Sequence, residues 1–153
     1  MIWKPNVTVA AVIEQNGQYL LVEETPNGVD IKLNQPAGHL EPGESILHAC
    51  SREVLEETGH TFLPEALTGI YHWHAPHNDT TYLRFTFSGR VTNFDPEREL
   101  DTGIIRATWF SLEEIRAKQA SHRSPMVMQC IEDYLTGRSY ALDILTHYGL
   151  VNE

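Results

Sequence analysis

The stretch GHLEPGESILHACSREVLEETG, residues 38–59, decides the fold and carries most of the chemistry of this sequence. Residues 34–43, which run into it, are rich in Gly and Pro and therefore do not form a helix. Ser45 is a suitable N-cap, and Gly59 is a suitable residue just beyond a helix C-terminus. We therefore predict one helix that begins near Ser45 and ends before Gly59.

Three glutamates share one face at the end of this helix. At about 100° per residue, Glu53, Glu56 and Glu57 lie within an arc of about 100°. The same arc overlaps or adjoins Ile46 and Cys50, so a face that starts apolar becomes acidic further along the helix. We expect the apolar part of this face to be buried.

The acidic face is unfavourable in a bare helix. Glu53 and Glu57 form a like-charge i, i+4 pair, which costs roughly 0.2–0.5 kcal/mol, and acidic groups near a helix C-terminus oppose the helix dipole. A solvated acidic face is one interpretation. A divalent cation between the carboxylates reverses both penalties and is the interpretation we favour. Because these ligands are all oxygens, we expect Mg²⁺, with Mn²⁺ as a substitute.

The pattern resembles the box of the Nudix (MutT-like) hydrolase family. The matching residues are Gly38, Glu44, Arg52-Glu53-Val54, Glu56-Glu57 and Gly59. One departure is His60, which stands where the family has an aliphatic residue. The resemblance implies an α/β (α+β) Nudix fold, in which a mixed β-sheet is sandwiched between helices and the box forms a loop–helix–loop.

The resemblance also implies metal-dependent hydrolysis of a phosphoanhydride. Glu53, Glu56 and Glu57 would hold the metal, and the carbonyl of Gly38 would complete its coordination. Arg52 would position a carboxylate, and Glu44 would support the acid–base chemistry. The catalytic residues implied are therefore Glu44, Arg52, Glu53 and Glu57, and the box alone does not assign the general base.

The rest of the chain alternates strands and helices. Asn16-Gly17 is a strong hairpin signal between two apolar runs, and the spacing from Ser111 to Glu114 is that of a capping box that opens a short helix. A final helix should follow Ser124-Pro125 and bury its apolar positions. The expected strands are 7–13, 18–22, 67–73, 80–91 and 104–110, and the apolar positions are Val127, Cys130, Ile131, Tyr134 and Leu135.

Composition sets the class of protein. A chain of 153 residues with 41% apolar residues predicts one globular domain over residues 1–153. The net charge of -10 argues against long nucleic acid as a partner.

No apolar run approaches the roughly 18 residues of a membrane span. With only two cysteines, reduced thiols and a cytoplasmic location are the simplest interpretation. Both a monomer and a homodimer remain open.

Short stretches outside the box resemble a bacterial branch of the family, the NudJ-type phosphatases. That branch is associated with removing terminal phosphate from nucleoside di- and triphosphates, and with thiamine diphosphate and its hydroxymethylpyrimidine diphosphate precursor. A departure is Leu33, where the branch often has Trp. The similar stretches are 34–41, 75–76, 82–85, Trp109 and 123–125.

Four residues are candidate substrate contacts. The planar guanidinium of Arg84 matches phosphate oxygens, His39 follows the box glycine, and Trp73, with Tyr82, offers an aromatic ring for stacking. For Arg84 the alternative is a surface arginine in a strand. For His39 it is a loop histidine held by backbone hydrogen bonds, and for the aromatic residues it is ordinary packing.

Two further groups have a structural and a functional interpretation. His72 and His74 share one face of a strand, where a zinc site is less favoured than half-exposed imidazoles. The acidic loop 95–101 is either solvated, which we favour, or supplies an extra metal ligand or the base.

The leading hypothesis is thus an Mg²⁺-dependent hydrolase of a small phosphoanhydride. The alternatives are a nucleoside triphosphate diphosphohydrolase, a nucleotide-sugar or ADP-ribose pyrophosphatase, and a non-catalytic binding or regulatory module. The intact cluster of Arg52 and the box glutamates argues against the last of these.

Overall fold

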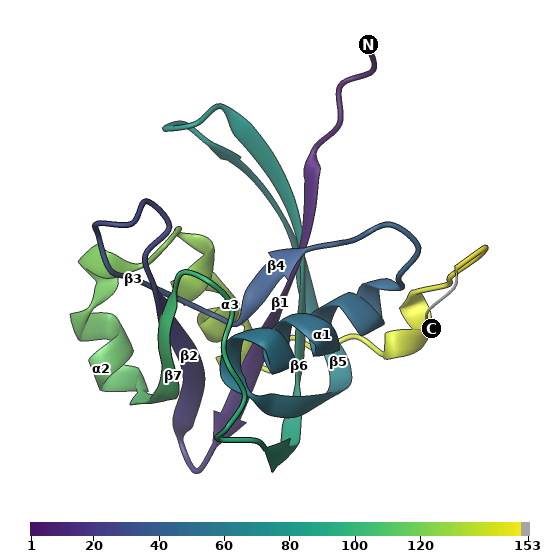
Figure 1. Cartoon of the computed structure of the whole chain (residues 1–153). Coiled ribbons are helices and arrows are strands. Elements are labelled where there is room, and N and C mark those ends of the chain that lie inside the picture. Colours follow the sequence, from purple (N-terminus) through teal and green to yellow (C-terminus); the bar gives the residue numbers. More distant parts are fainter. Residues whose placement is uncertain (151–153) are drawn as a thin grey trace.

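A computed structural model describes residues 1–150 of the chain (Figure 1). The strands are β1 (Asn6–Gln15), β2 (Gln18–Glu24), β3 (Lys32–Asn34), β4 (Ala37–His39), β5 (His60–Ala75), β6 (Thr80–Phe94) and β7 (Ile104–Ser111). The helices are α1 (Ile46–Thr58), α2 (Leu112–Ala117) and α3 (Met126–Leu135), with short 3-10 turns η1 (Gln119–Ser121) and η2 (Leu142–Ile144).

The mixed sheet divides into two parts that share β1. In one part β1 pairs in parallel with β6 and antiparallel with β4, and β5 forms a long hairpin with β6. In the other part β2 pairs with β3 and β7. Since β1 meets β2 only at Glu14–Gln15 and Gln18–Tyr19, the two parts separate beyond their common hairpin. Away from this hairpin, residues of both parts line one cleft.

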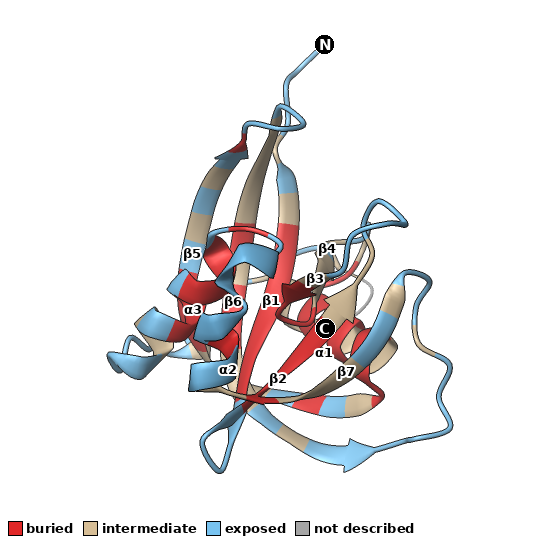
Figure 2. Cartoon of the chain, turned by 90° about the vertical axis from the view of Figure 1, so that its left-hand side faces the viewer, coloured by how far each residue is buried: buried red, intermediate tan, exposed pale blue. Residues whose placement is uncertain are grey.

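Helices cover the sheet on both faces, and each face has its own apolar core (Figure 2). On one face α1 buries Ala49, Cys50 and Val54 against β1, β5 and β6. On the other face α2 and α3 bury Ile115, Cys130 and Ile131. The expected sandwich is confirmed.

Helix α1 has the predicted limits. Ser45 accepts a hydrogen bond from the backbone N–H of His48, at 3.0 Å, and so caps the N-terminus. Gly59 adopts a left-handed conformation with φ 76° and donates its N–H to the carbonyl of Leu55. A side chain at Gly59 would also collide with the carbonyl of Asp95, because its Cβ would lie 2.8 Å away. These contacts fix the orientation of the glutamates at the end of the helix.

Most other predicted elements are confirmed, with two differences. The Asn16-Gly17 turn, the capping box of α2 and the final helix are present. However, β5 begins at His60 instead of Leu67, because irregular pairing with β6 carries the strand past Pro64. The prediction that Leu135 faces the core is wrong: it is 48% exposed, because it ends α3 beyond the edge of the apolar core.

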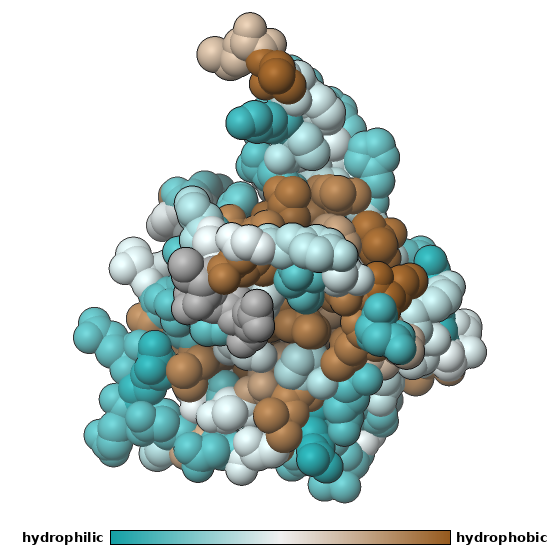
Figure 3. All heavy atoms as spheres, turned by 90° about the vertical axis from the view of Figure 1, so that its right-hand side faces the viewer, coloured by the Kyte–Doolittle hydropathy of each residue, from teal (hydrophilic) through white to brown (hydrophobic). Residues whose placement is uncertain are grey.

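The segment after α3 returns to the α1 side of the sheet. Tyr140 and Leu67 exchange two backbone hydrogen bonds of 2.8 Å, and Leu142 and Leu145 pack on the core there. Figure 3 shows this face, on which apolar side chains gather around the C-terminal segment. Within residues 1–150, no helix is long and apolar enough to cross a membrane.

We expect Ser45→Ala to lower the free energy of unfolding by about 1 kcal/mol, because the N–H of His48 loses its acceptor. Urea unfolding measures this change. Ser139→Ala, at an exposed position, is the matched control and should leave stability unchanged. Equal stability of the two variants would show that the Ser45 cap does not stabilise α1.

Candidate active site

One guanidinium holds the carboxylates of the box together. Arg52 donates hydrogen bonds to both oxygens of Glu44, from Nε to Oε2 at 2.9 Å and from Nη2 to Oε1 at 2.7 Å. Its Nη1 donates to Glu53 at 2.8 Å and to Glu56 at 2.9 Å, and its Nη2 also donates to the carbonyl of His39. Arg52 therefore ties the loop before α1 to the last turns of the helix.

The Arg52–Glu44 pair is ionised and fixed. The hydrogen bond from Arg52 holds the pKa of Glu44 below its ordinary value, and the bond to Glu44 raises the pKa of Arg52. Glu44 also accepts the backbone N–H of Glu41, at 2.8 Å, so both of its oxygens are engaged. A carboxylate bound in this way suits a positioning role better than proton transfer.

Gly38 makes room for Glu53. A Cβ at position 38 would lie 2.1 Å from Cδ of Glu53 and 2.3 Å from each of its carboxylate oxygens. No side chain larger than that of glycine is compatible with this contact. The box glycine thus allows the backbone of β4 to lie directly against the carboxylate of Glu53.

The structure adds Asp101 to the acidic group. Carboxylate oxygens of Glu53, Glu56 and Asp101 lie within 4.8 Å of one another, and the backbone N–H of Asp101 donates to the carbonyl of Glu56 at 3.0 Å. Asp101 stays exposed, in agreement with the solvated interpretation of the loop 95–101. Its backbone contact to the end of α1 also places its carboxylate beside the glutamates, where the alternative of an extra metal ligand has a geometric basis.

Glu57 occupies a separate place in the same site. Its Oε1 accepts the backbone N–H of Ala37 at 2.9 Å, and only 8% of the residue is exposed. Burial raises the pKa of Glu57 to about 9 and that of Glu53 to about 7. Burial also raises the pKa of Asp101 above its ordinary value. Glu53 and Glu57 are therefore held where their charge is poorly solvated, whereas Asp101 is exposed.

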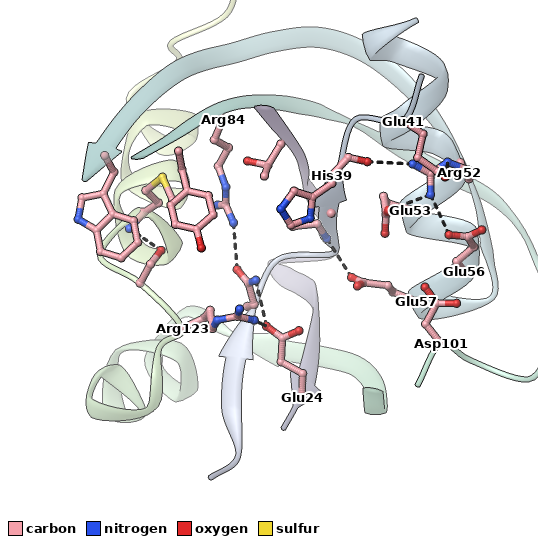
Figure 4. A pocket seen from close by; sticks show the side chains of 18 of the residues that line it. Glu24, His39, Glu41, Arg52, Glu53, Glu56, Glu57, Arg84, Asp101 and Arg123 are labelled. Carbon is pink, nitrogen blue, oxygen red and sulfur yellow. Dashed lines mark hydrogen bonds and ion pairs between the residues drawn. The ribbon is translucent and has the colours of Figure 1, made fainter. Parts of the chain in front are cut away.

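One cleft of about 650 Å³ is lined by the carboxylates of Glu53, Glu56, Glu57 and Asp101. Figure 4 shows Arg52, Glu53, Glu56, Glu57 and Asp101 at one end. The cleft lies between the two parts of the sheet, because β1, β4 and β6 line one side and β2 and β3 the other. Lining residues from these strands include Thr8, Glu24, Asn34, His39 and Arg84.

The four candidate substrate contacts all line this cleft. Trp73 stacks on Tyr82, its partner across the β5–β6 hairpin, with ring centroids 5.8 Å apart and planes 19° apart. His39 is exposed at the end of β4. Arg84 is 4% exposed, so the alternative of a surface arginine is wrong.

His60 and His74, which lie outside the cleft, have structural partners. His74 bonds to Thr81 at 3.0 Å and pairs with Asp79 at 3.1 Å, and no His-containing metal group occurs within residues 1–150. His60 stacks on Phe94, with ring centroids 4.4 Å apart, and burial lowers its pKa. The ring of His60 thus packs as an apolar group would, which accounts for its departure from the box pattern.

The sequence profile of the NUDIX domain matches residues 3–130. The chain belongs to the Nudix family. The phosphatase NudJ of Escherichia coli strain K12 is 41% identical over 149 residues, which are 97% of this chain and 95% of that relative. The phosphatase NudJ of Shigella boydii serotype 4 (strain Sb227) is 40% identical over 148 residues, with the same coverage.

A solved structure is also similar. The NUDIX hydrolase from Nitrosomonas europaea is 76% identical, with a TM-score of 0.94, and the match covers 95% of this chain and 98% of that one. This Nudix protein is therefore a hydrolase acting on phosphoanhydrides, and the predicted Nudix fold is confirmed.

Without metal, the protein should lose stability as the pH rises from about 5 to about 9. An unfolded glutamate titrates near about 4.3, whereas folding raises the pKa of Glu53 to about 7 and of Glu57 to about 9. The folded state therefore binds more protons than the unfolded state in this range, so its stability falls as the protons leave.

Urea unfolding in EDTA across this pH range measures the effect. The double variant Glu53→Gln/Glu57→Gln is the reference, because it keeps the shape of both side chains but removes both titrations. Its stability should fall less with pH than that of the wild type. Parallel pH profiles would show that burial of these carboxylates does not govern the pH dependence.

Proposed function

We propose that residues 1–153 act as a single Nudix hydrolase domain that depends on Mg²⁺, for which Mn²⁺ can substitute. The proposed substrate is a small nucleotide or thiamine-type diphosphate: a nucleoside di- or triphosphate, thiamine diphosphate, or its hydroxymethylpyrimidine diphosphate precursor. The observation that carries the proposal is the group of Glu53, Glu56 and Asp101 at the end of a cleft. Arg52 binds the carboxylates of Glu53 and Glu56, Gly38 leaves room for Glu53, and a backbone hydrogen bond to Glu56 holds Asp101 in place.

The residues fit a hard divalent cation. All the side-chain ligands are carboxylates, which Mg²⁺ and Mn²⁺ prefer, and the missing side chain at Gly38 leaves its backbone against Glu53. We infer that Glu53, Glu56 and Asp101 hold the ion, with Glu57 and the Gly38 carbonyl as further ligands. When bound, such an ion would neutralise phosphate charge and favour attack by water.

The residues of the box would have different roles, some in positioning and some in proton transfer. Arg52 and Glu44 act as positioning residues, because each satisfies the other and neither has a reason to exchange a proton. Glu57 has one oxygen fixed by the N–H of Ala37, so its other oxygen would either bind the ion or accept a proton from an attacking water. Glu53 is the other candidate base, since burial raises its pKa to about 7.

The opposite end of the cleft would take the organic part of the substrate. Trp73 and Tyr82 present a stacked aromatic pair there, which is suited to a flat heterocycle such as a pyrimidine or purine. His39 lies between this pair and the carboxylates, where its imidazole can donate a hydrogen bond to a phosphate oxygen. The cleft volume of about 650 Å³ is in the range of small-molecule sites.

Other aspects of the sequence prediction remain proposals. The alternatives are release of diphosphate from a nucleoside triphosphate and cleavage of a nucleotide sugar or ADP-ribose. The buried, free thiols of Cys50 and Cys130 support a cytoplasmic location, and the net charge of -10 supports a small substrate rather than long nucleic acid. A non-catalytic module is disfavoured, since it has no use for the intact cluster of Arg52 and the box glutamates.

We expect Glu57→Gln to lower kcat by orders of magnitude while the protein stays folded. Glutamine keeps the shape and can still accept the N–H of Ala37, but it neither takes a proton nor binds a cation as a carboxylate does. Steady-state kinetics at saturating Mg²⁺ and circular dichroism test both parts. Glu113→Gln, at an exposed position of α2, is the matched control. Turnover near that of the control would remove Glu57 from the machinery.

A product assay tests the substrate class. The protein with Mg²⁺ is given nucleoside di- and triphosphates, thiamine diphosphate, ADP-ribose and a dinucleoside polyphosphate, and orthophosphate and diphosphate are measured separately. Orthophosphate from the first two groups or from thiamine diphosphate supports the proposal. Diphosphate release, or cleavage of linked nucleotides only, favours the alternative hydrolases. No turnover with either Mg²⁺ or Mn²⁺ favours the non-catalytic module.

A further inference from the structure

Arg84 is a buried cation that no carboxylate neutralises among the residues described. It is 4% exposed, and its side-chain contacts are to neutral groups. Nη1 donates to the amide oxygen of Gln35 at 3.1 Å and to the sulfur of Cys130 at 3.7 Å, and Nη2 donates to the amide oxygen of Asn34 at 3.1 Å. Nε is buried and has no acceptor within residues 1–150.

The two amides hold this guanidinium in a fixed place. Gln35 is fully buried and donates its Nε2 to the carbonyl of Val127 at 2.7 Å. Asn34 donates its Nδ2 to the carboxylate of Glu24 at 3.1 Å. Because a carbonyl and a carboxylate only accept hydrogen bonds, both amides must turn their oxygens toward Arg84. They orient the charge without cancelling it.

The nearby Arg123 shows the contrast. It also lines the cleft, but its Nη1 pairs with Glu24 at 2.8 Å, and 41% of its side chain is exposed. Its charge is thus both paired and solvated, whereas that of Arg84 is neither. A buried charge without a partner is unfavourable, so the arrangement at Arg84 is one that an anion in the cleft would complete.

The sheet register places Arg84 between the two ends of the cleft. Thr8 of β1 pairs with both Arg84 and His39, so these residues form one row across β6, β1 and β4. Tyr82, two residues away on β6, lies on the same face and stacks with Trp73. On the other side of the row, Gly38 touches Glu53. Figure 4 shows the Arg84 side chain reaching into the space between the strands.

We propose that Arg84, oriented by Asn34 and Gln35, is an anion-binding subsite, distinct from the carboxylate cluster, that takes a phosphate group without a divalent cation. The ligand is a phosphate monoester dianion, because its oxygens match the guanidinium and its charge supplies the missing counter-ion. Its identity as part of the substrate or product rests on the proposed function. The subsite itself rests only on the contacts of Arg84.

Thermal unfolding in EDTA tests the subsite without catalysis. EDTA removes divalent cations, so binding at the carboxylate cluster does not contribute. Orthophosphate and cytidine monophosphate are the probes, and sodium chloride at equal ionic strength is the reference. We expect both probes to raise the Tm of the wild type above the reference. A larger shift with the monophosphate would show that the ligand is an organic phosphate that also reaches Trp73 and Tyr82.

Two variants isolate the cause. Arg84→Met should abolish the phosphate-dependent shift, whereas Arg90→Met should keep it, because Arg90 is an exposed arginine on the same strand. If Arg84→Met does not fold, Gln35→Glu serves instead. It places a carboxylate next to Arg84 and supplies an internal counter-ion, so the shift should also disappear although the cation is retained.

The proposal is overturned if the wild type shows no shift beyond sodium chloride, or if Arg84→Met or Gln35→Glu keeps the full shift. These outcomes are independent of hydrolysis. A protein that binds phosphate through Arg84 in EDTA but hydrolyses nothing with Mg²⁺ would contradict the proposed function and leave the subsite intact. The reverse result would contradict the subsite alone.

Discussion

The site depends on one residue, Arg52, whose guanidinium forms hydrogen bonds and ion pairs with the carboxylates around it. Its bidentate bond to Glu44 joins the loop before α1 to the helix, and its Nη1 donates to both Glu53 and Glu56. Without this cation, acidic side chains crowded near a helix C-terminus would repel one another and oppose the helix dipole. With it, the protein keeps an acidic cluster together while the cleft remains open to a ligand.

The two ends of the cleft carry charges of opposite sign. At the α1 end, excess negative charge is buried, and protons or divalent cations would relieve it. At the β6 end, Arg84 is a buried positive charge held by neutral amides, and an anion would relieve it. A phosphate-containing ligand with a bound cation satisfies both ends at once. The division of the sheet makes this possible, since β2 and β3 lie on one side of the cleft and β1, β4 and β6 on the other.

The sequence predicts the box helix well because its signals are local. Ser45, Gly59 and the glutamate spacing act within a few residues, so each can be read without knowing the fold. The sequence leaves open both the place of Asp101 and the burial of Arg84, because both depend on contacts between distant segments. Asp101 joins the cluster through a backbone bond to Glu56, and the buried setting of Arg84 depends on α3 packing over β6.

Anomalous diffraction from a crystal soaked in Mn²⁺ tests the central claim most directly, because it locates the ion without reference to any substrate. The account predicts a peak between the carboxylates of Glu53, Glu56 and Asp101. An ion bound elsewhere in the structure, with no peak between these three carboxylates, would contradict the assignment of this cluster as the metal site of the hydrolase.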